Sequence, residues 1–518
     1  MSVRAPDAAG RRDLSIAAAL AVAVIVSRLP FAGVILYHWD SINFALALSH
    51  FDVRAAQPHI PGYPLYVLLG RAVNLWAGDA QRALVAISAV SSGLAVAALF
   101  LLGRAMFDRV TGVIAALLLA ASPLFWFYGA IALPHCLDAL MVIGTVSLLY
   151  RLRLGAASLT VPAALWLGIA GGLRPQSQIF LAPLALYAGW PLDWRRRALG
   201  VAVLAAVDLL WFVPMIELSG GWNAYTVALR SFNDAFTDST SVFAHGGWFG
   251  LTRNLTKLGM YTLYGLGGAL LLVPLAVVAI WRRGPRATDL TDPRAVVIAL
   301  WMGPALAFYA LIHMGQQGLV FVFLPALLLL LARAVCTLRL RVAGWATALA
   351  VAAGAAIFIA APTFPLAGDR PKLLTADTLR RQDAAYVGKF AALRSGFAPA
   401  DSAILSSGWR FPQYYLPQFA LVRFGVAARW ERGEGAPTRR DRTWVDLHAL
   451  GLTPGADGRY RVVVLEDELA ALNATPGRAD TIRLADGTIL TVLHVAPDER
   501  LYLGPDGFAV VADQALPP

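Results

Sequence analysis

The sequence predicts a mainly α-helical, polytopic membrane protein of about eleven transmembrane helices with a small C-terminal α/β domain. Hydrophobic residues make up 58% of its 518 residues and charged residues only 14%, far from the averages of soluble domains. Apolar runs, many close to the roughly 20 residues that cross a bilayer, recur up to residue 361. We therefore expect a membrane domain at 1–361 and a second domain at 362–518.

The predicted spans begin with an apolar run that has a basic start and an Ala-rich core, as signal peptides have. Arg28 and the lack of a small-residue cleavage site favour an uncleaved span. The eleven runs cover 14–36, 83–103, 112–128, 134–150, 159–173, 176–190, 198–216, 257–281, 295–312, 318–336 and 343–361.

The positive charge of the chain predicts its orientation in the membrane. Residues 1–360 hold 25 Lys and Arg against 14 Asp and Glu, whereas residues 361–518 hold 18 of each. A cytoplasmic N-terminus places every short basic loop inside, as the positive-inside rule requires. The excess thus reflects topology, and nucleic acid is not expected as a partner. The odd number of spans puts the C-terminal domain on the periplasmic side of a bacterial inner membrane. The basic loop residues are Arg104, Arg109, Arg151, Arg153, Arg195, Arg196, Arg197, Arg282, Arg283, Arg286, Arg294, Arg339 and Arg341.

The C-terminal domain shows strand-like runs such as "YRVVVLEDE" and "GTILTVLHVA", and a helix-like stretch at 376–394. Cys136 and Cys336 lie in spans near opposite faces and are not expected to pair. The stretch "GGLRPQ" lacks the Lys-Ser/Thr of a P-loop, which disfavours ATP-driven transport.

Two long outer loops, 37–82 and 218–253, concentrate polar and aromatic residues on one face. A helix-like stretch follows Asp40, and an amphipathic stretch from Tyr63 to Trp76 fits a helix lying in the membrane interface. Transporters usually bind substrate near the midplane, so this distribution indicates an enzyme whose active site opens outward.

The motifs of the membrane half resemble those of one enzyme superfamily. An Asp follows the first span, the first outer loop contains "QPHIPGYPLY", and "LPHCLDAL" enters the fourth span. This pattern is similar to the GT-C superfamily of lipid-dependent glycosyltransferases, especially family 39, which includes bacterial relatives of protein O-mannosyltransferases. The resemblance implies a GT-C type fold with interfacial helices in the first outer loop. It also implies transfer of mannose, or another hexose or pentose, from a polyprenyl phosphate to a hydroxyl of a protein, lipid or polysaccharide.

Such a transfer needs a base on the acceptor oxygen and cationic or hydrogen-bonding groups on the departing phosphate. Asp40 is the predicted base; the alternative is a helix N-cap. Asp138 is the second predicted catalytic residue, because carboxylates within membrane spans are usually functional. Its alternative is an ion pair with an Arg of the first loop.

Arg174 in "GLRPQSQ" is predicted to hold the donor phosphate, since Arg can form two parallel hydrogen bonds to it. The alternative is an interfacial Arg that reaches toward water. His313 and Gln317 in "HMGQQG" are further candidates for substrate binding, and a plain polar turn is the alternative for them. Arg410 is also a candidate, and strand-to-loop packing is its alternative. The full set of predicted substrate-binding residues is His59, Tyr63, His135, Arg174, Gln176, His313, Gln317 and Arg410.

A divalent metal is a further candidate, with Asp40 and Asp138, together with His59 or His135, as ligands. Asp208, in the seventh span, is expected to pair with Arg28 or a buried Ser. Two other functions stay open: a lipid-linked saccharide flippase or transporter, and a membrane assembly protein without chemistry.

Overall fold

Two compact units make up the chain. The computed structural model describes residues 8–283, 291–362, 373–425, 443–484, 487–504 and 506–512. Contacts group Met1–Gly33, Pro61–Trp222 and Phe236–Leu379 into unit 1, and Val34–Ile60, Asn223–Ala235 and Arg380–Pro518 into unit 2. The expected boundary at 361 stays a prediction. The contacts nevertheless place the segment that contains Asp40 with the C-terminal residues.

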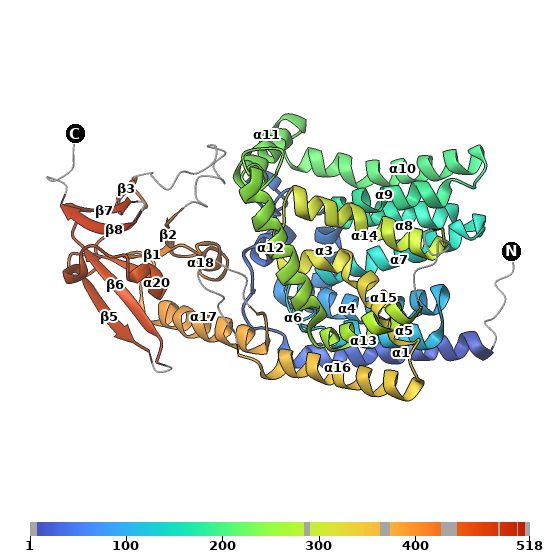
Figure 1. Ribbon diagram of the computed structural model, residues 1–518. Coiled ribbons are helices and arrows are strands. Elements are labelled where there is room, and N and C mark those ends of the chain that lie inside the picture. The colour runs from blue at the N-terminus through green and yellow to red at the C-terminus, as the bar shows by residue number, and fades with distance from the viewer. Residues whose placement is uncertain are drawn as a thin grey trace. The chain divides into compact units, whose positions relative to one another are not determined.

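Unit 1 is helical (Figure 1). Neighbouring helices pack in sequence-local pairs, such as α1 on α4, α4 on α5 and α8 on α10. Its helices of five residues or more are α1 (Ala8–Arg28), α3 (Pro64–Ala77), α4 (Ala80–Met106), α5 (Arg109–Ala120), α6 (Pro123–Tyr128), α7 (His135–Arg153), α8 (Thr160–Leu173), α9 (Pro175–Gly189), α10 (Trp194–Leu218), α12 (Gly247–Leu266), η5 (Gly267–Leu272), α13 (Val273–Arg283), α14 (Pro293–Leu311), η7 (Gln317–Val322), α15 (Leu324–Val335) and α16 (Leu340–Ala360).

The chain is a multi-pass membrane protein, although eleven full spans are not confirmed. In the described residues, seven helical stretches are long and apolar enough to cross a membrane. Shorter apolar helices, such as 109–120 and 324–335, correspond to parts of other predicted runs. The seven are Gly10–Phe31, Ala80–Met106, His135–Arg153, Trp194–Leu218, Gly247–Arg282, Pro293–Leu311 and Leu340–Ala360.

Breaks inside the apolar runs have local causes. Ser122 separates α5 from α6, because its Oγ accepts the Phe125 amide and donates to the Gly265 carbonyl at 2.6 Å. Pro123 then begins α6. Gly267 has φ +50°, which favours glycine, and a Cβ there would lie 2.4 Å from Pro123. An apolar run alone therefore overestimates the length of an unbroken span.

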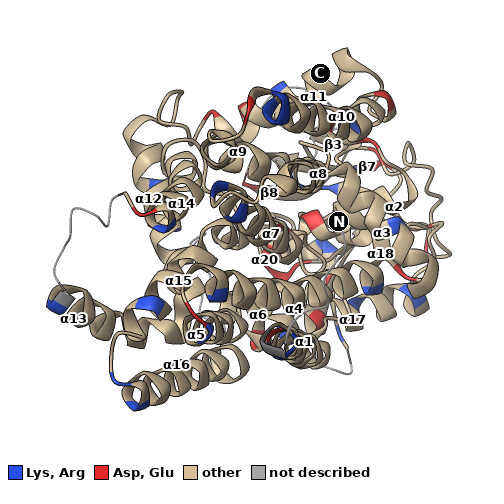
Figure 2. Cartoon of the chain, turned by 90° about the vertical axis from the view of Figure 1, so that its right-hand side faces the viewer, with Lys and Arg blue, Asp and Glu red and all other residues tan. Residues whose placement is uncertain are grey.

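Charges of unit 1 are concentrated near helix ends, and the helix bodies are mostly uncharged (Figure 2). Asp13 in the second turn of α1 binds Arg104 near the end of α4 at 2.5 Å and Arg109 at the start of α5 at 2.6 Å. One carboxylate thus joins three helix ends on the face predicted to be cytoplasmic.

The segment 218–253, which is predicted to be an outer loop, is largely helical. Helix α11 (Trp222–Phe232) continues into the π-helical turn η4 (Asn233–Thr237). Helix α12 begins at Gly247, ten residues before the predicted run at 257. The run was placed too late because Arg253 and Lys257 lower the local hydropathy of the first turns.

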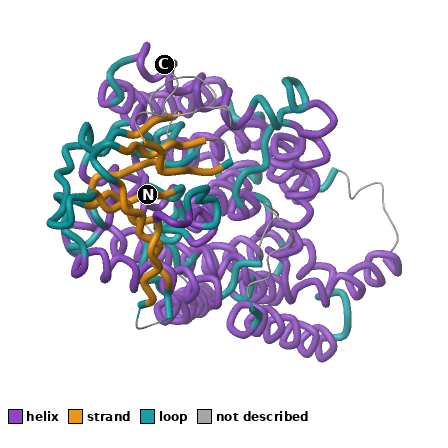
Figure 3. The backbone as a smooth tube through the Cα atoms, turned by 90° about the vertical axis from the view of Figure 1, so that its left-hand side faces the viewer, coloured by secondary structure: helices purple, strands orange, loops and turns teal. Residues whose placement is uncertain are grey.

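Unit 2 contains every strand that the described residues form (Figure 3). One sheet has the order β2-β1-β4-β6-β5, with β2, β1 and β4 parallel and the rest antiparallel; a second has the order β3-β7-β8. The strands are β1 (Ser402–Ser406), β2 (Ala420–Arg423), β3 (Thr443–Val445), β4 (Tyr460–Val464), β5 (Ala479–Arg483), β6 (Ile489–Val495), β7 (Glu499–Gly504) and β8 (Gly507–Ala512). Helices α17 (Ala376–Gly396), α18 (Arg410–Tyr415) and α20 (Asp467–Ala470) accompany them, and α2 (Trp39–Ser49) and η2 (Val53–Ala55) come from the first outer loop.

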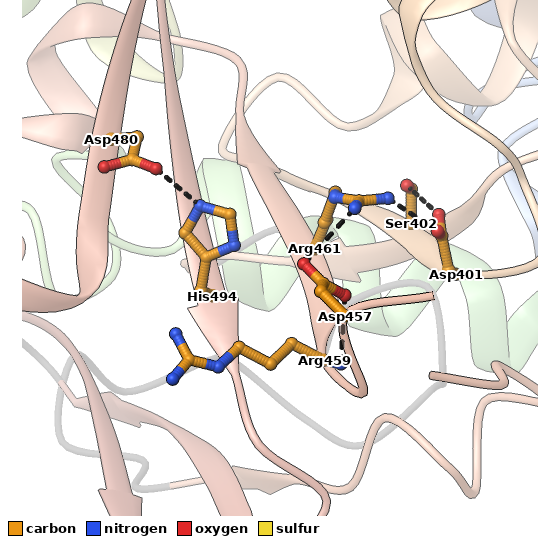
Figure 4. Close-up of polar contacts among 7 residues, drawn as sticks. All are labelled: Asp401, Ser402, Asp457, Arg459, Arg461, Asp480 and His494. Atoms are coloured by element: carbon orange, nitrogen blue, oxygen red, sulfur yellow. Dashed lines mark hydrogen bonds and ion pairs between the residues drawn. The ribbon is translucent and has the colours of Figure 1, made fainter. Parts of the chain in front are cut away.

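Charged side chains link neighbouring strands of the larger sheet (Figure 4). Arg461 Nη1 lies 2.6 Å from Asp401 Oδ2, and Arg461 Nη2 lies 3.3 Å from Asp457 Oδ2. His494 on β6 contacts Asp480 on the neighbouring edge strand β5 at 2.8 Å. The pairs with the exposed carboxylates of Asp457 and Asp480 contribute about 0–1 kcal/mol each. The buried Val, Leu and Phe core of the domain therefore contributes most of its stability.

Candidate active site

Asp40 lies in the first turn of α2, but it does not cap the helix. His38 is the N-cap residue, and its Nδ1 accepts the Asp40 amide at 3.0 Å. The same Nδ1 lies 3.6 Å from Asp40 Oδ2. His59 Nδ1 lies 3.5 Å from Asp40 Oδ1. The Asp40 side chain is 17% exposed, so a ligand can reach it.

Asp138 and Arg174 form a buried ion pair in unit 1. Asp138, in the first turn of α7, accepts from Arg174 Nη1 at 2.8 Å and from Ser177 Oγ at 2.5 Å. The two charged side chains are 3% and 5% exposed. Arg174 stands between α8 and α9, where Pro175 begins the second helix. The expected ion pair of Asp138 therefore exists, but its partner is Arg174 and not an Arg of the first loop.

His135 joins this pair to the loop before η7. Its Nδ1 lies 3.4 Å from Arg174 Nη1, and its Nε2 lies 2.8 Å from Gln316 Oε1. The ring also meets Tyr128 edge-on at 4.9 Å. Gly318 makes this approach feasible, because a Cβ there would lie 2.6 Å from the His135 ring.

Tyr63 begins α3 in an unusual backbone conformation. Its φ and ψ are both 47°, in the left-handed region that non-glycine residues rarely adopt. The side chain is 7% exposed, and its phenol lies close enough to interact electrostatically with Arg174. Strain of this kind often occurs at functional sites. Gln176 is partly buried in the first turn of α9, and Gln317 is 8% exposed at the start of η7.

His313 lies outside the Asp138 cluster. Its Nδ1 is 2.9 Å from Thr240 Oγ1. Burial, together with the charges of Arg253 and Lys257, lowers the pKa of His313 to about 4. The imidazole is therefore neutral at pH 7.

Arg253 and Lys257 are candidate site residues that sequence reasoning missed. They lie one turn apart on α12, and both interact electrostatically with His313. Arg253 donates to Asn254 Oδ1 and to the Met314 carbonyl. Within the described ranges, no carboxylate pairs with either cation. The i, i+4 spacing of two cations near the start of a predicted span was the signal that could have identified them.

Arg410 belongs to unit 2 and is almost fully buried, at 1% exposed. It donates to Gln413 Oε1 at 2.8 Å and to the Ala55 carbonyl at 2.5 Å. These contacts fit the packing alternative better than substrate binding.

The predicted metal ligands occur as two separate groups. Asp40 and His59 belong to unit 2, and Asp138 and His135 belong to unit 1. No cluster of three or more His, Cys, Asp or Glu side chains suited to a metal is found in the part of the chain that the structure describes. Both Asp138 oxygens already accept hydrogen bonds from Arg174 and Ser177. A metal ion stays a prediction.

The prediction that Asp208 pairs with Arg28 or with a buried Ser was wrong. Its Oδ2 accepts from Gln178 Nε2 at 2.7 Å, while Arg28 donates to the Ala120 carbonyl and lies over the Trp126 ring at 4.3 Å. Gln178 on α9 therefore binds Asp208 without supplying a second charge. Cys136 and Cys336 are both free, as expected.

Comparison with solved structures gives the fold. The chain is similar to ArnT from Cupriavidus metallidurans bound to undecaprenyl phosphate, with a TM-score of 0.59 and 14% identity over 92% of this chain and 97% of that one. The apo state of ArnT gives a TM-score of 0.59 and 13% identity over 94% and 98%. This chain has the fold of ArnT. At this identity the likeness establishes the fold alone.

Two further comparisons concern sequence and a more distant structure. Residues 44–188 match the N-terminal domain of the protein O-mannosyl-transferase TMEM260. The Archaeoglobus fulgidus oligosaccharyltransferase, in complex with Zn and sulfate, gives a TM-score of 0.46 and 14% identity over 87% of this chain and 67% of that one. No curated protein matches the sequence. The matched region, residues 44–188, includes Asp138 and Arg174 but begins four residues after Asp40.

Proposed function

We propose that this GT-C chain transfers a sugar from a polyprenyl-phosphate carrier to a hydroxyl acceptor on the periplasmic face, with Asp40 as general base. The observation that carries this proposal is the partial exposure of the Asp40 carboxylate, which is not needed to cap its helix. This carboxylate is partly exposed, and His38 performs the capping that would otherwise account for it. A general base must reach the hydroxyl that it deprotonates, and a partly exposed carboxylate can do so.

The Asp138 cluster has a different proposed role. A carboxylate whose two oxygens are held by Arg174 and Ser177 is poorly suited to take a proton. It is well suited to fix Arg174 and, through it, His135. In this proposal Asp138 and Arg174 orient the substrate-binding residues around them, Tyr63 and His135 included.

Arg253 and Lys257 are the better candidates for the departing phosphate. Arg174 already uses Nη1 for Asp138, whereas the two cations of α12 have no carboxylate partner among the described residues. Cations that lack a carboxylate can stabilise the negative charge that develops on a leaving phosphate. The neutral His313 beside them adds a hydrogen-bonding group without charge.

The donor is proposed to be lipid-linked, in keeping with the undecaprenyl phosphate bound to ArnT. Each buried methylene is worth about 0.8 kcal/mol, so a long isoprenoid chain stays in the bilayer. A water-soluble nucleotide sugar should fail as donor.

Substitution of Asp40 tests the proposal. Asp40→Asn keeps the shape of the side chain and removes its basicity, so we expect a loss of about 100-fold or more in kcat with normal insertion. Release of polyprenyl phosphate by the purified protein is the measurement, and it also separates an enzyme from a flippase. Asp52→Asn, in the same segment, is the matched control, because Asn can still accept the Arg54 amide. Full activity in Asp40→Asn would reject Asp40 as the base.

A second pair of variants tests the phosphate contact. Arg253→Gln and Lys257→Gln should each raise the KM for the lipid donor by roughly 10-fold, the effect of about 1.4 kcal/mol of lost binding. Arg82→Gln, which removes an exposed cation near the start of α4, is the control. An unchanged donor KM in both α12 variants would remove these residues from the site.

A further inference from the structure

We propose that the C-terminal part of unit 2 holds the segment that carries Asp40 in place, with Asp383, Trp409, Arg410 and Tyr415 as positioning residues. This inference rests on the proposed function for its catalytic meaning. The docking itself is observed directly within unit 2, which contains both Val34–Ile60 and Arg380–Pro518.

The segment before α2 depends on side chains far along the chain for its hydrogen bonds. Asp383 on α17 accepts the amides of Val34 at 3.0 Å and Ile35 at 2.8 Å. The Leu36 amide donates to the Tyr415 hydroxyl at 2.8 Å. Residues 32–38 contain no helix or strand, so no regular structure of their own pairs these amides. Backbone donors without a partner are costly when buried.

The start of α2 and the chain after it are held as well. Trp39, next to Asp40, meets Trp409 edge-on with ring centroids 5.0 Å apart. Beyond the helix, the Ala55 carbonyl accepts from Arg410. Trp409 and Arg410 are 0% and 1% exposed. The Asp40 segment is therefore fixed before, at and after the residue proposed to act as base.

The contact surface is itself rigidly supported by the domain. Trp409, Arg410 and Tyr415 belong to the stretch that follows β1, where the chain leaves the parallel part of the sheet and forms α18. Glu466, just after β4, accepts the Ser407 and Gly408 amides at 3.1 and 3.0 Å. Burial raises the pKa of Glu466 above its usual range, although these hydrogen bonds oppose the shift.

Aromatic stacking fixes α18 against α17. Tyr386 stacks on Phe411 at 4.6 Å with an angle of 7° between the rings, and Phe390 stacks on Tyr415 at 5.3 Å. Arg423 of β2 lies 4.0 Å from the Trp409 ring centroid. Groups locked in this way can hold a catalytic side chain to the precision that chemistry needs.

We expect substitutions of the positioning residues to lower kcat without changing the donor KM. A looser Asp40 segment lowers the fraction of complexes in which the carboxylate is aligned with the acceptor hydroxyl. The proposed phosphate contacts belong to α12 in unit 1 and are left intact. Positioning variants should therefore lower kcat by roughly 10- to 100-fold and leave the donor KM within about twofold. A variant that merely unfolds part of the protein would also lower the apparent kcat without changing KM, but it would do so equally with and without the Asp40 carboxylate.

Hydrogen exchange on the full-length protein tests the docking without reference to activity. Tyr415→Phe removes the oxygen that accepts the Leu36 amide, and Trp409→Ala removes the ring beside Trp39. Both should speed exchange at residues 34–36, and Trp409→Phe should restore much of the protection. Trp444→Ala is the matched control, because Trp444 packs on Tyr502 in the three-stranded sheet. Unchanged exchange in both docking variants would overturn the proposal.

Measurements of kcat test whether these residues position Asp40. Tyr415→Phe and Trp409→Ala should lower kcat in the otherwise native enzyme, and Tyr415→Phe should have no further effect in an Asp40→Asn background. Faster exchange at 34–36 with native kcat would overturn positioning. An equal loss with and without Asp40 would overturn it too, because the effect would not act through the carboxylate. If Asp40→Asn proved fully active, Asp40 would fail as the base, whereas the exchange result would still decide the docking.

Discussion

The Asp138 and Arg174 pair places two opposite charges in a nearly water-free part of unit 1. Removing one member of such a pair leaves an uncompensated buried charge, which costs about 3–5 kcal/mol. Arg174→Met should therefore lower the stability of the purified protein by this amount, measured by thermal unfolding in detergent. Arg54→Met is the control, because Arg54 is 55% exposed in its pair with Asp52 and should cost at most about 1 kcal/mol. Equal shifts in the two variants would show that Asp138 is solvated or paired elsewhere.

His313 makes stability depend on pH in a defined direction. Its folded pKa of about 4 lies below the ordinary value of 6.5, so the unfolded chain binds a proton first as the pH falls. The stability that a neutral His313 contributes is present above pH 6.5 and is lost as the pH falls through 4. We expect roughly 1–3 kcal/mol, allowing for partial exposure. The drop in Tm between pH 7.5 and pH 4.5 should be smaller in His313→Gln than in the native protein; an identical drop would contradict the assignment.

At the scale of elements, the contact between η7 and α7 depends on the missing side chain of Gly318. A methyl there would lie 2.6 Å from the His135 ring and 2.7 Å from Tyr128. Gly318→Ala should push η7 away and cost about 1–3 kcal/mol, with loss of transfer activity as His135 moves.

Gly303 offers the matched control for this contact. It lies inside α14 with open space around its Cα, so Gly303→Ala has no clash to relieve. It should leave activity unchanged and stabilise the helix by about 0.5–1 kcal/mol. Native activity in Gly318→Ala would show that the approach of η7 to His135 is not needed.

For the whole molecule, the distribution of arginine predicts that the C-terminal domain and the Asp40 segment face the periplasm. In a background of Cys136→Ala and Cys336→Ala, Leu450→Cys should react with a membrane-impermeant thiol reagent in cells with a permeabilised outer membrane. Leu450 is 41% exposed. Leu340→Cys, at the first residue of α16, a position 71% exposed, should react only after the inner membrane is broken. The opposite pattern would invert the topology and place the proposed site on the cytoplasmic face.

The sequence predicted the elements whose signals are local. The amphipathic stretch 63–76 corresponds to α3, the stretch 376–394 to α17, and two strand-like runs to β4 and β6. Apolar periodicity and composition are sufficient for these, because each segment carries its own pattern. The predicted number of eleven spans is not confirmed, since short helices such as α5 and α15 are as apolar as full spans. Ser122 and Pro123 interrupt the chain after α5, and Pro325 lies at the start of α15.

The sequence by itself determined the class of protein, its arginine-rich faces and the motifs that carry the GT-C resemblance, because each depends on composition or on neighbouring residues. Only the tertiary structure decided which polar groups pair with one another. It paired Asp138 with Arg174, gave Asp208 to Gln178, and joined residues 34–36 to Asp383 and Tyr415. A buried polar group takes whichever partner the packing of distant helices and strands brings within about 3 Å, and a linear pattern carries no record of that distance.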